Sequence, residues 1–228
     1  MKQKLNSYLN KIDVPNYSIN QEKFNSHSHF LGVPIALFVF IYSLYLFISN
    51  KVTSGIFIGL VIYSLTILVL YLASALYHIE NPAKKAKKVK RIIDHCTIYL
   101  LIAGTYTPIA LFIYQQSYMG LIILLLEWFF AIVGIIFNAI DLTNKYIKAY
   151  SMFSYLFMGW MIVFLWSFKY LPETSFLFVL GGGIAYTLGS ILYGFGRKNA
   201  NFHCVFHVFD LVGTILQAIG VLLLFVSK

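Results

Sequence analysis

Long apolar runs separated by short polar connectors are the dominant pattern along the chain. A helix needs about 20 predominantly apolar residues to cross the hydrocarbon core of a bilayer. These runs reach that length without Lys or Arg, and they lack the period-two alternation of membrane strands, so they predict helices. The runs lie approximately at residues 30–49, 54–77, 93–114, 118–138, 150–168, 174–195 and 204–226.

Seven such spans predict an all-α fold, an integral-membrane bundle of seven transmembrane helices. The connectors are too short for a separate soluble domain, so we expect a polar arm at 1–29 and one transmembrane domain at 30–228. No small-residue cleavage site stands out after the arm, and we expect no cleaved signal peptide. The composition favours the same class, because only 11% of the residues are charged, against roughly 25% in soluble domains.

Basic residues gather on one side of the predicted bundle. The arm and the second, fourth and sixth connectors carry nearly all of the 17 Lys and Arg residues, including the run AKKAKKVKR at 83–91. The positive-inside rule therefore predicts a multi-pass protein of the cytoplasmic membrane, with the N-terminus in the cytoplasm and the C-terminus outside. This topology accounts for the basic charge without nucleic acid as a partner. Contact of the 83–91 run with anionic lipid headgroups is an alternative use of these lysines.

The last apolar run opens with NFHCVFHVFD, at the predicted cytoplasmic end of its span. At about 100° per residue, the polar residues of this span share one helical face, and the flanking Phe and Val residues lie elsewhere. Ionisable side chains inside a membrane are costly unless they face the bundle interior and find partners there. We therefore expect this polar stripe to point inward. It consists of His203, His207, Asp210, Thr214 and Gln217.

Polar residues at the ends of three other spans fall at the same predicted depth. The second span closes with SALYH, which places Ser74 and His78 one helical turn apart. The third span opens with Asp94, and Asn25 and His29 precede the first. Histidines and carboxylates from four spans at one depth indicate a metal site. An unmetallated hydrogen-bond network is the alternative.

Zinc is the metal that this set of residues favours. Neutral imidazole is a preferred zinc ligand, and catalytic zinc has three protein ligands with a fourth position for water. We expect His78, His203 and His207 to be the ligands. Asp94 would hold the bound water and accept its proton, and Ser74 would donate to that water or to a substrate oxygen. Nickel, cobalt and iron also accept imidazole, so zinc rests on geometry and availability.

Several linked motifs resemble the haemolysin III family, the bacterial branch of the progestin and adipoQ receptor superfamily. In chain order they are EKFNSHSH at 22–29, SALYH at 74–78, Asp94 followed by GTYTP at 104–108, and HCVFH at 203–207. The resemblance implies a seven-helix membrane protein that holds zinc through His78, His203 and His207. It also implies that Asp94 and Ser74 lie close to the zinc-bound water, in agreement with the ligand set above.

Four further residues need an interpretation. Asn25 and His29 belong to the first motif but not to the implied ligands, so we expect them to contact and orient the ligands, with a purely structural role as the alternative for His29. Asp210 departs from the family pattern, and three roles stay open: a carboxylate that supports the ligands, a competing ligand, or a hydrogen bond to a neighbouring helix. Glu127, beside Trp128 in the fourth span, matches no motif and is either protonated and hydrogen-bonded or functional.

The family's similarity to alkaline ceramidases implies a zinc-dependent hydrolase of a lipid amide or ester, with membrane lipids as partners and a lipid substrate that enters between helices. Asp94 would then act as general base, and Ser74 would help to bind the oxyanion. A non-enzymatic membrane sensor or cytolytic protein with structural zinc is the first alternative. A channel or transporter is the second, and it predicts discontinuous helices and charges near the bilayer midplane, such as Glu127.

Overall fold

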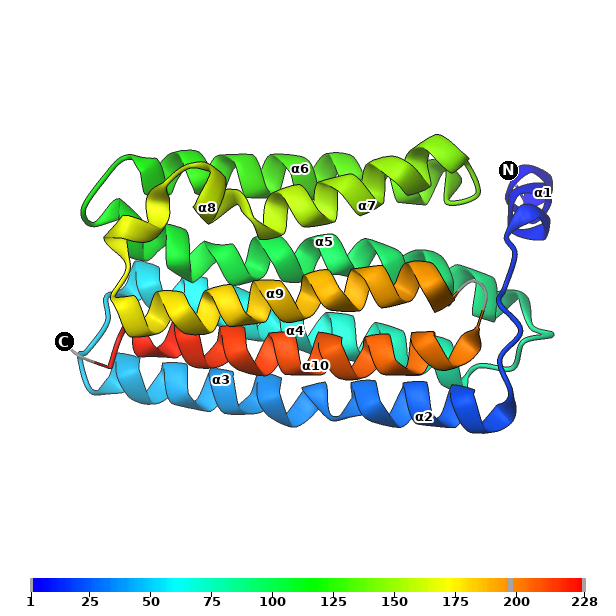
Figure 1. Ribbon diagram of the computed structural model, residues 1–228, viewed down its shortest axis with the longest axis horizontal. Helices are drawn as coiled ribbons and strands as arrows, with labels where there is room; N and C mark the ends of the chain where they lie inside the picture. Colours follow the sequence, from blue (N-terminus) through cyan, green and yellow to red (C-terminus); the bar gives the residue numbers. More distant parts are fainter. Residues whose placement is uncertain (1, 197–198, 227–228) are drawn as a thin grey trace.

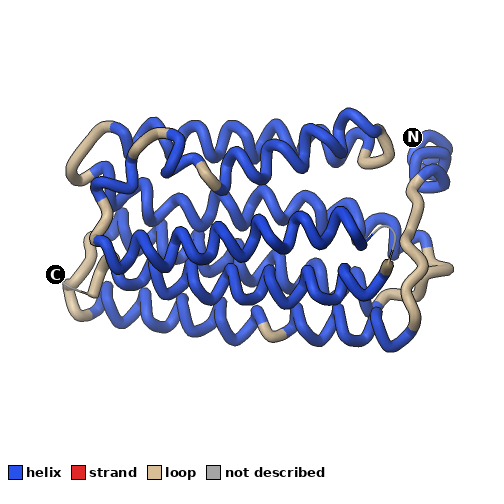
Figure 2. The backbone as a smooth tube through the Cα atoms, in the orientation of Figure 1, coloured by secondary structure: helices blue, strands red, loops and turns tan. Residues whose placement is uncertain are grey.

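The computed structural model describes residues 2–196 and 199–226, and every regular element in these ranges is helical (Figure 2). Six helical stretches there are long and apolar enough to cross a membrane. The all-α membrane fold is therefore confirmed. The six stretches are Ile19–Ile48, Ser54–Ile79, Lys85–Tyr114, Met119–Asp141, Glu173–Gly196 and Ala200–Leu223.

The elements follow one another with short connections. In chain order they are α1 (Lys2–Lys11), α2 (Ile19–Phe30), α3 (Gly32–Ile48), α4 (Ser54–Ile79), α5 (Lys85–Tyr114), α6 (Met119–Asp141), α7 (Lys145–Gly159), α8 (Met161–Phe164), the 3₁₀ turn η1 (Ser167–Tyr170), α9 (Glu173–Gly196) and α10 (Ala200–Leu223).

The long helices lie side by side along one axis (Figure 1). The most extensive packing joins α10 to α9, α4 to α5, and α5 to α6, whereas α7 touches α5 and α9 only lightly. Helix α1 lies at the end of the bundle where α10 begins, and α10 finishes at the opposite end. We call the first of these the α1 end. This placement of the two ends of the chain is the one that an odd number of crossings gives.

The first span starts earlier than the apolar pattern indicates. Helix α2 begins at Ile19 and continues through Leu31 into α3, so the second half of the expected polar arm belongs to the bundle. Ser18 caps this helix with a capping box, in which its hydroxyl accepts from the Gln21 N–H and the Gln21 side chain accepts from the Ser18 N–H. The motif residues Asn25 and His29 therefore sit on a helix, and both are buried.

The prediction that residues 150–168 form a single helix, the fifth span, was wrong. Helix α7 ends at Gly159, and the chain continues as α8 and η1, with Trp166 at a positive φ of 52°. The cause is a side chain inserted into the helical ladder. The Tyr106 hydroxyl of α5 donates to the Gly159 carbonyl at 2.8 Å and accepts from the Ile162 N–H at 3.4 Å. The Trp160 indole N–H donates to Thr187 of α9 at 3.0 Å, which holds the break in place.

Replacing Tyr106 with Phe tests this account of the break. The change leaves the Gly159 carbonyl and the Ile162 N–H without their partner, at a cost of about 1–3 kcal/mol for a buried group. We expect a lower free energy of unfolding and a lower midpoint of thermal unfolding in detergent. Tyr114→Phe is the matched control, because Tyr114 lies on the same helix but is about half exposed. Equal stability of the two variants would show that Tyr106 does not support the break.

Candidate metal centre

Three buried histidines meet at the α1 end of the bundle. His78 lies in the last turn of α4, and His203 and His207 lie in the first turns of α10. One ring nitrogen of each lies within 4.8 Å of the others, and the three side chains form a group that could hold a metal ion. The sequence stripe therefore does face the bundle interior, as expected, with Thr214 and Gln217 also buried.

The spacing of the two α10 nitrogens fits a tetrahedral ion. The Nε2 atoms of His203 and His207 are 3.1 Å apart, and two nitrogen ligands of tetrahedral zinc are about 3.3 Å apart for Zn–N bonds of about 2.0–2.1 Å. The spacing of four residues on a helix places both rings on one face. Three imidazoles are the donor set of a catalytic zinc site that keeps one position open. The residues therefore fit zinc.

A carboxylate from α2 fixes the orientation of the third histidine. The Nδ1 atom of His78 lies 2.7 Å from Oε2 of Glu22. Nδ1–H then donates to the carboxylate, which leaves Nε2 of His78 as the ligand atom. Carboxylate–histidine pairs of this kind are a regular feature of zinc sites. Sequence reasoning quoted Glu22 only as part of a motif and gave it no role; its position one turn before Asn25 in that motif was the available signal.

An aromatic side chain covers the centre from the connection between α1 and α2. The Tyr17 ring stacks on the His203 ring, with centroids 4.9 Å apart and planes 9° apart. Burial raises the pKa of the Tyr17 phenol, which stays neutral at physiological pH. Sequence analysis did not single out Tyr17, because it lies in an extended segment without periodicity.

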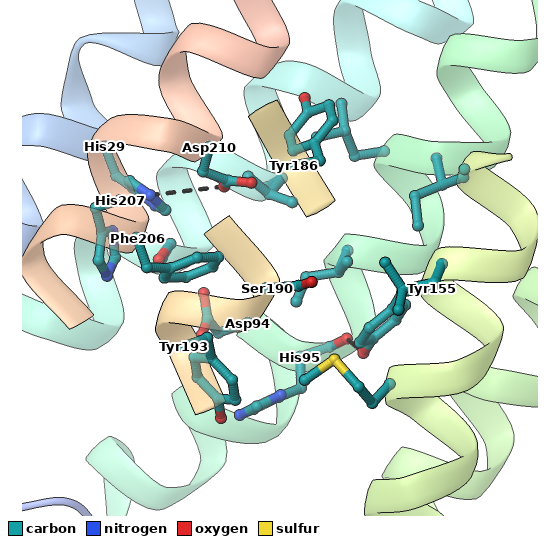
Figure 3. A pocket seen from close by; sticks show the side chains of 18 of the residues that line it. His29, Asp94, His95, Tyr155, Tyr186, Ser190, Tyr193, Phe206, His207 and Asp210 are labelled. Atoms are coloured by element: carbon teal, nitrogen blue, oxygen red, sulfur yellow. Dashed lines mark hydrogen bonds and ion pairs between the residues drawn. The ribbon is translucent and has the colours of Figure 1, made fainter. Parts of the chain in front are cut away.

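Asp94 and Ser74 line the same cavity as the three histidines. Ser74 lies one turn before His78 on α4, and Asp94 lies on α5. Figure 3 shows Asp94, His207 and Tyr193 among the side chains that line the cavity. All five residues that the sequence assigned to the metal and to catalysis line this one cavity, and the ligand atoms of the three histidines converge. Their chemical roles stay predictions.

His29 of α2 contacts both Asp210 and His207 of α10. The Nε2 atom of His29 is 3.7 Å from Oδ2 of Asp210, and the His29 ring centroid is 3.8 Å from that of His207 (Figure 3). Neither residue belongs to the group of converging ligand atoms. Asn25, one turn before His29, is fully buried, and its amide has no hydrogen-bond partner within the described part of the chain.

An elongated cavity of about 160 Å³ leads from the histidines toward the middle of the bundle. Its lining runs from His203 to Gln217 on α10, which is roughly 21 Å of helix at 1.5 Å per residue. At its far end it reaches Tyr106 and the broken helix at Trp160. Most of the lining side chains are apolar or aromatic, so an apolar chain fits this space. Polar groups concentrate at the histidine end.

Two further buried or cavity-facing titratable residues, His95 and Glu127, differ in their relation to the cavity. His95 of α5 lines the cavity. Glu127 of α6 is fully buried, and its carboxyl oxygens have no hydrogen-bond partner among the described residues. It is not among the residues that line the cavity.

Comparison with known proteins gives the family. The family described as "Haemolysin-III related" matches residues 17–218. A "Hemolysin-3 homolog" of Bacillus subtilis (strain 168) is 34% identical over 200 residues, which cover 87% of this chain and 91% of the relative. "Hemolysin-3" of Bacillus cereus is 34% identical over 211 residues, which cover 90% of this chain and 91% of the relative. The chain therefore belongs to the haemolysin-III-related family and is a membrane protein of that family.

Metal analysis of purified variants tests the centre. We expect His78→Ala and His207→Ala to lose most of the bound metal, because removal of one of three ligands leaves an incomplete site. Elemental analysis of the detergent-purified proteins measures this directly. His27→Ala is the control, because His27 is exposed on α2. Metal content that is equal in all variants, or no metal in the wild-type protein, would rule out this ligand set.

Proposed function

We propose that this protein is a zinc-dependent hydrolase of a lipid amide or ester, with its centre at the cytoplasmic side of the cell membrane. One observation carries the proposal: three buried histidines with converging nitrogens lie at the polar end of an elongated apolar cavity. Ligand sites of this form, apolar with a few convergent polar groups, are the usual sites of chemistry. The polar end would take the amide or ester, and the apolar length would take the acyl chain.

The chain's own groups supply the remaining functions. Zinc, when bound, supplies a Lewis acid that polarises a carbonyl and makes water more acidic. The Asp94 carboxylate would accept a proton from the attacking water and return it to the leaving group. Ser74 would donate a hydrogen bond to the carbonyl oxygen as it gains negative charge. Tyr17, stacked on His203, would limit the access of bulk water from the α1 end.

The light contact of α7 with α9 and α5 supports entry of the lipid substrate from the side of the bundle where α7 lies. The cavity lining includes residues of all three helices, such as Met152, Tyr186 and Ile102. A lipid would therefore reach the centre laterally, between α7 and α9, without crossing an aqueous phase. This route suits a substrate that is itself dissolved in the membrane.

Cytolysis is the second candidate, because both relatives carry the name hemolysin. In that case zinc would be structural and no turnover would occur. A transporter is less well supported: the interruption of α7 agrees with it, but Glu127 does not line the cavity. Assays of zinc content, lipid hydrolysis and red-cell lysis on the same samples distinguish the hydrolase from the cytolytic protein.

Asp94→Asn tests the proposal. It keeps the size of the side chain but removes the base, so we expect zinc content to stay at the wild-type level while hydrolysis of lipid amides falls about 10²- to 10⁴-fold. Fluorescent acyl-amide and acyl-ester lipids in mixed micelles provide the assay, with release of red-cell haemoglobin measured in parallel. Glu173→Gln, an exposed carboxylate at the opposite end of the bundle, is the control. Zinc with lysis and no turnover in the wild type would favour cytolysis.

A further inference from the structure

One lysine of the basic run 83–91 is fully buried. Lys87 has no exposed surface, whereas Lys84 and Lys85 of the same run are exposed. An ammonium group removed from water is strongly destabilising unless ionic and hydrogen-bonding partners replace the water. Orientation in a membrane requires only that lysines lie on the correct side, so it does not explain why this one is buried.

The Lys87 ammonium has three specific contacts. Nζ donates to Oε1 of Glu22 at 2.7 Å and to the backbone carbonyl of His78 at 3.1 Å. It also lies 4.5 Å from the centre of the Tyr77 ring, a cation–π contact. All three partners lie on α2 or at the end of α4, so Lys87 of α5 joins both helices at the point where His78 is carried.

The Glu22 carboxylate is shared between Lys87 and His78. Oε1 accepts from Lys87 and Oε2 faces Nδ1 of His78, each at 2.7 Å. A carboxylate with both oxygens engaged cannot rotate without breaking one of these contacts. Its position therefore fixes the plane of the His78 ring, and the acceptance of Nδ1–H fixes the tautomer in which Nε2 is free.

We propose that Glu22 and Lys87 are positioning residues of the metal centre: Lys87 holds the Glu22 carboxylate, and Glu22 orients His78 for metal binding. This inference rests on the metal centre of the proposed function and extends it from the ligands to a second carboxylate and a buried cation. Neither residue needs to touch the ion. The pair also carries no net charge, so it orients His78 without adding a net charge beside the ion.

A purely structural ion pair between α2, α4 and α5 would have the same contacts, and a matched pair distinguishes the two roles. Glu80, directly after α4, pairs with Lys90 of α5 through Oε2 and Nζ, also at 2.7 Å. This pair joins α4 to α5, two of these three helices, at the same end of the bundle, and neither of its side chains contacts a histidine in the described part of the chain. Loss of the Glu80 pair therefore removes a link between helices without affecting the orientation of His78.

The experiment is a zinc competition titration with a chromophoric chelator on the full-length protein in detergent. We expect Glu22→Gln and Lys87→Met each to weaken zinc binding by roughly 10- to 100-fold, the usual cost of losing a group that orients a ligand. The double variant should bind zinc about as weakly as Glu22→Gln alone, because Lys87 acts through Glu22. Glu80→Gln and Lys90→Met should bind zinc as the wild type does. Cobalt-loaded samples should show altered visible absorption only in the Glu22 and Lys87 variants.

Wild-type zinc affinity in Glu22→Gln and Lys87→Met, even with a lower thermal midpoint without metal, would overturn the positioning role and leave the metal centre intact. Weakened binding of equal size in the Glu80 and Lys90 variants would overturn it as well. Absence of zinc from the wild type would overturn the proposed function together with this inference. If Lys87→Met does not fold, the nearly isosteric Glu22→Gln decides the question alone.

Discussion

No water is available in the hydrocarbon core to pair with polar groups, so each buried donor or acceptor must find its partner within the protein. The α10 stripe shows how this is met: the Thr214 hydroxyl bonds to the hydroxyls of both Tyr71 and Tyr186, at 2.7 and 2.6 Å. The same constraint shapes the break after α7, where a tyrosine hydroxyl replaces backbone partners. Some buried polar groups have no hydrogen-bond partner within the described chain. They belong to Asn25, His29 and His207 at the histidine cluster and to Tyr63, Glu127 and Ser175 elsewhere.

Much of the architecture and of the histidine cluster was predictable from the sequence, because both depend on local periodicity. Apolar runs of sufficient length gave the helices, and spacings of four residues placed His203 beside His207 and Ser74 beside His78. The rule that costly polar residues face the bundle interior then brought α4, α5 and α10 together at one depth. Each of these steps uses the geometry of a single helix and needs no knowledge of how neighbouring helices rotate.

The remaining features depend on contacts between helices, which periodicity does not contain. Lys87 lies in a run with basic residues on every helical face, so the run alone does not show which lysine is buried. Helix α5 starts at Lys85, before the expected start near residue 93, and this earlier start directs Lys87 into the bundle. Glu22 gains its role because α2 is a continuous helix that reaches α4. The interruption at Gly159 is imposed by Tyr106, which lies 53 residues away. In each case a contact with a residue far away in the sequence determines the local structure, and the local sequence pattern does not reveal that contact.

The three histidines of the candidate metal centre come from widely separated parts of the chain, and this has a consequence for biosynthesis. His78 and its supporting Glu22 lie in the first helices to be made, whereas His203 and His207 lie in the last. Contacts across such a sequence separation form late, since the intervening chain must first be ordered. The early helices must therefore persist in the membrane with an incomplete set of ligands until α10 has inserted. Capture of the ion would then coincide with completion of the bundle, so metal occupancy would report that a nascent molecule has finished assembling.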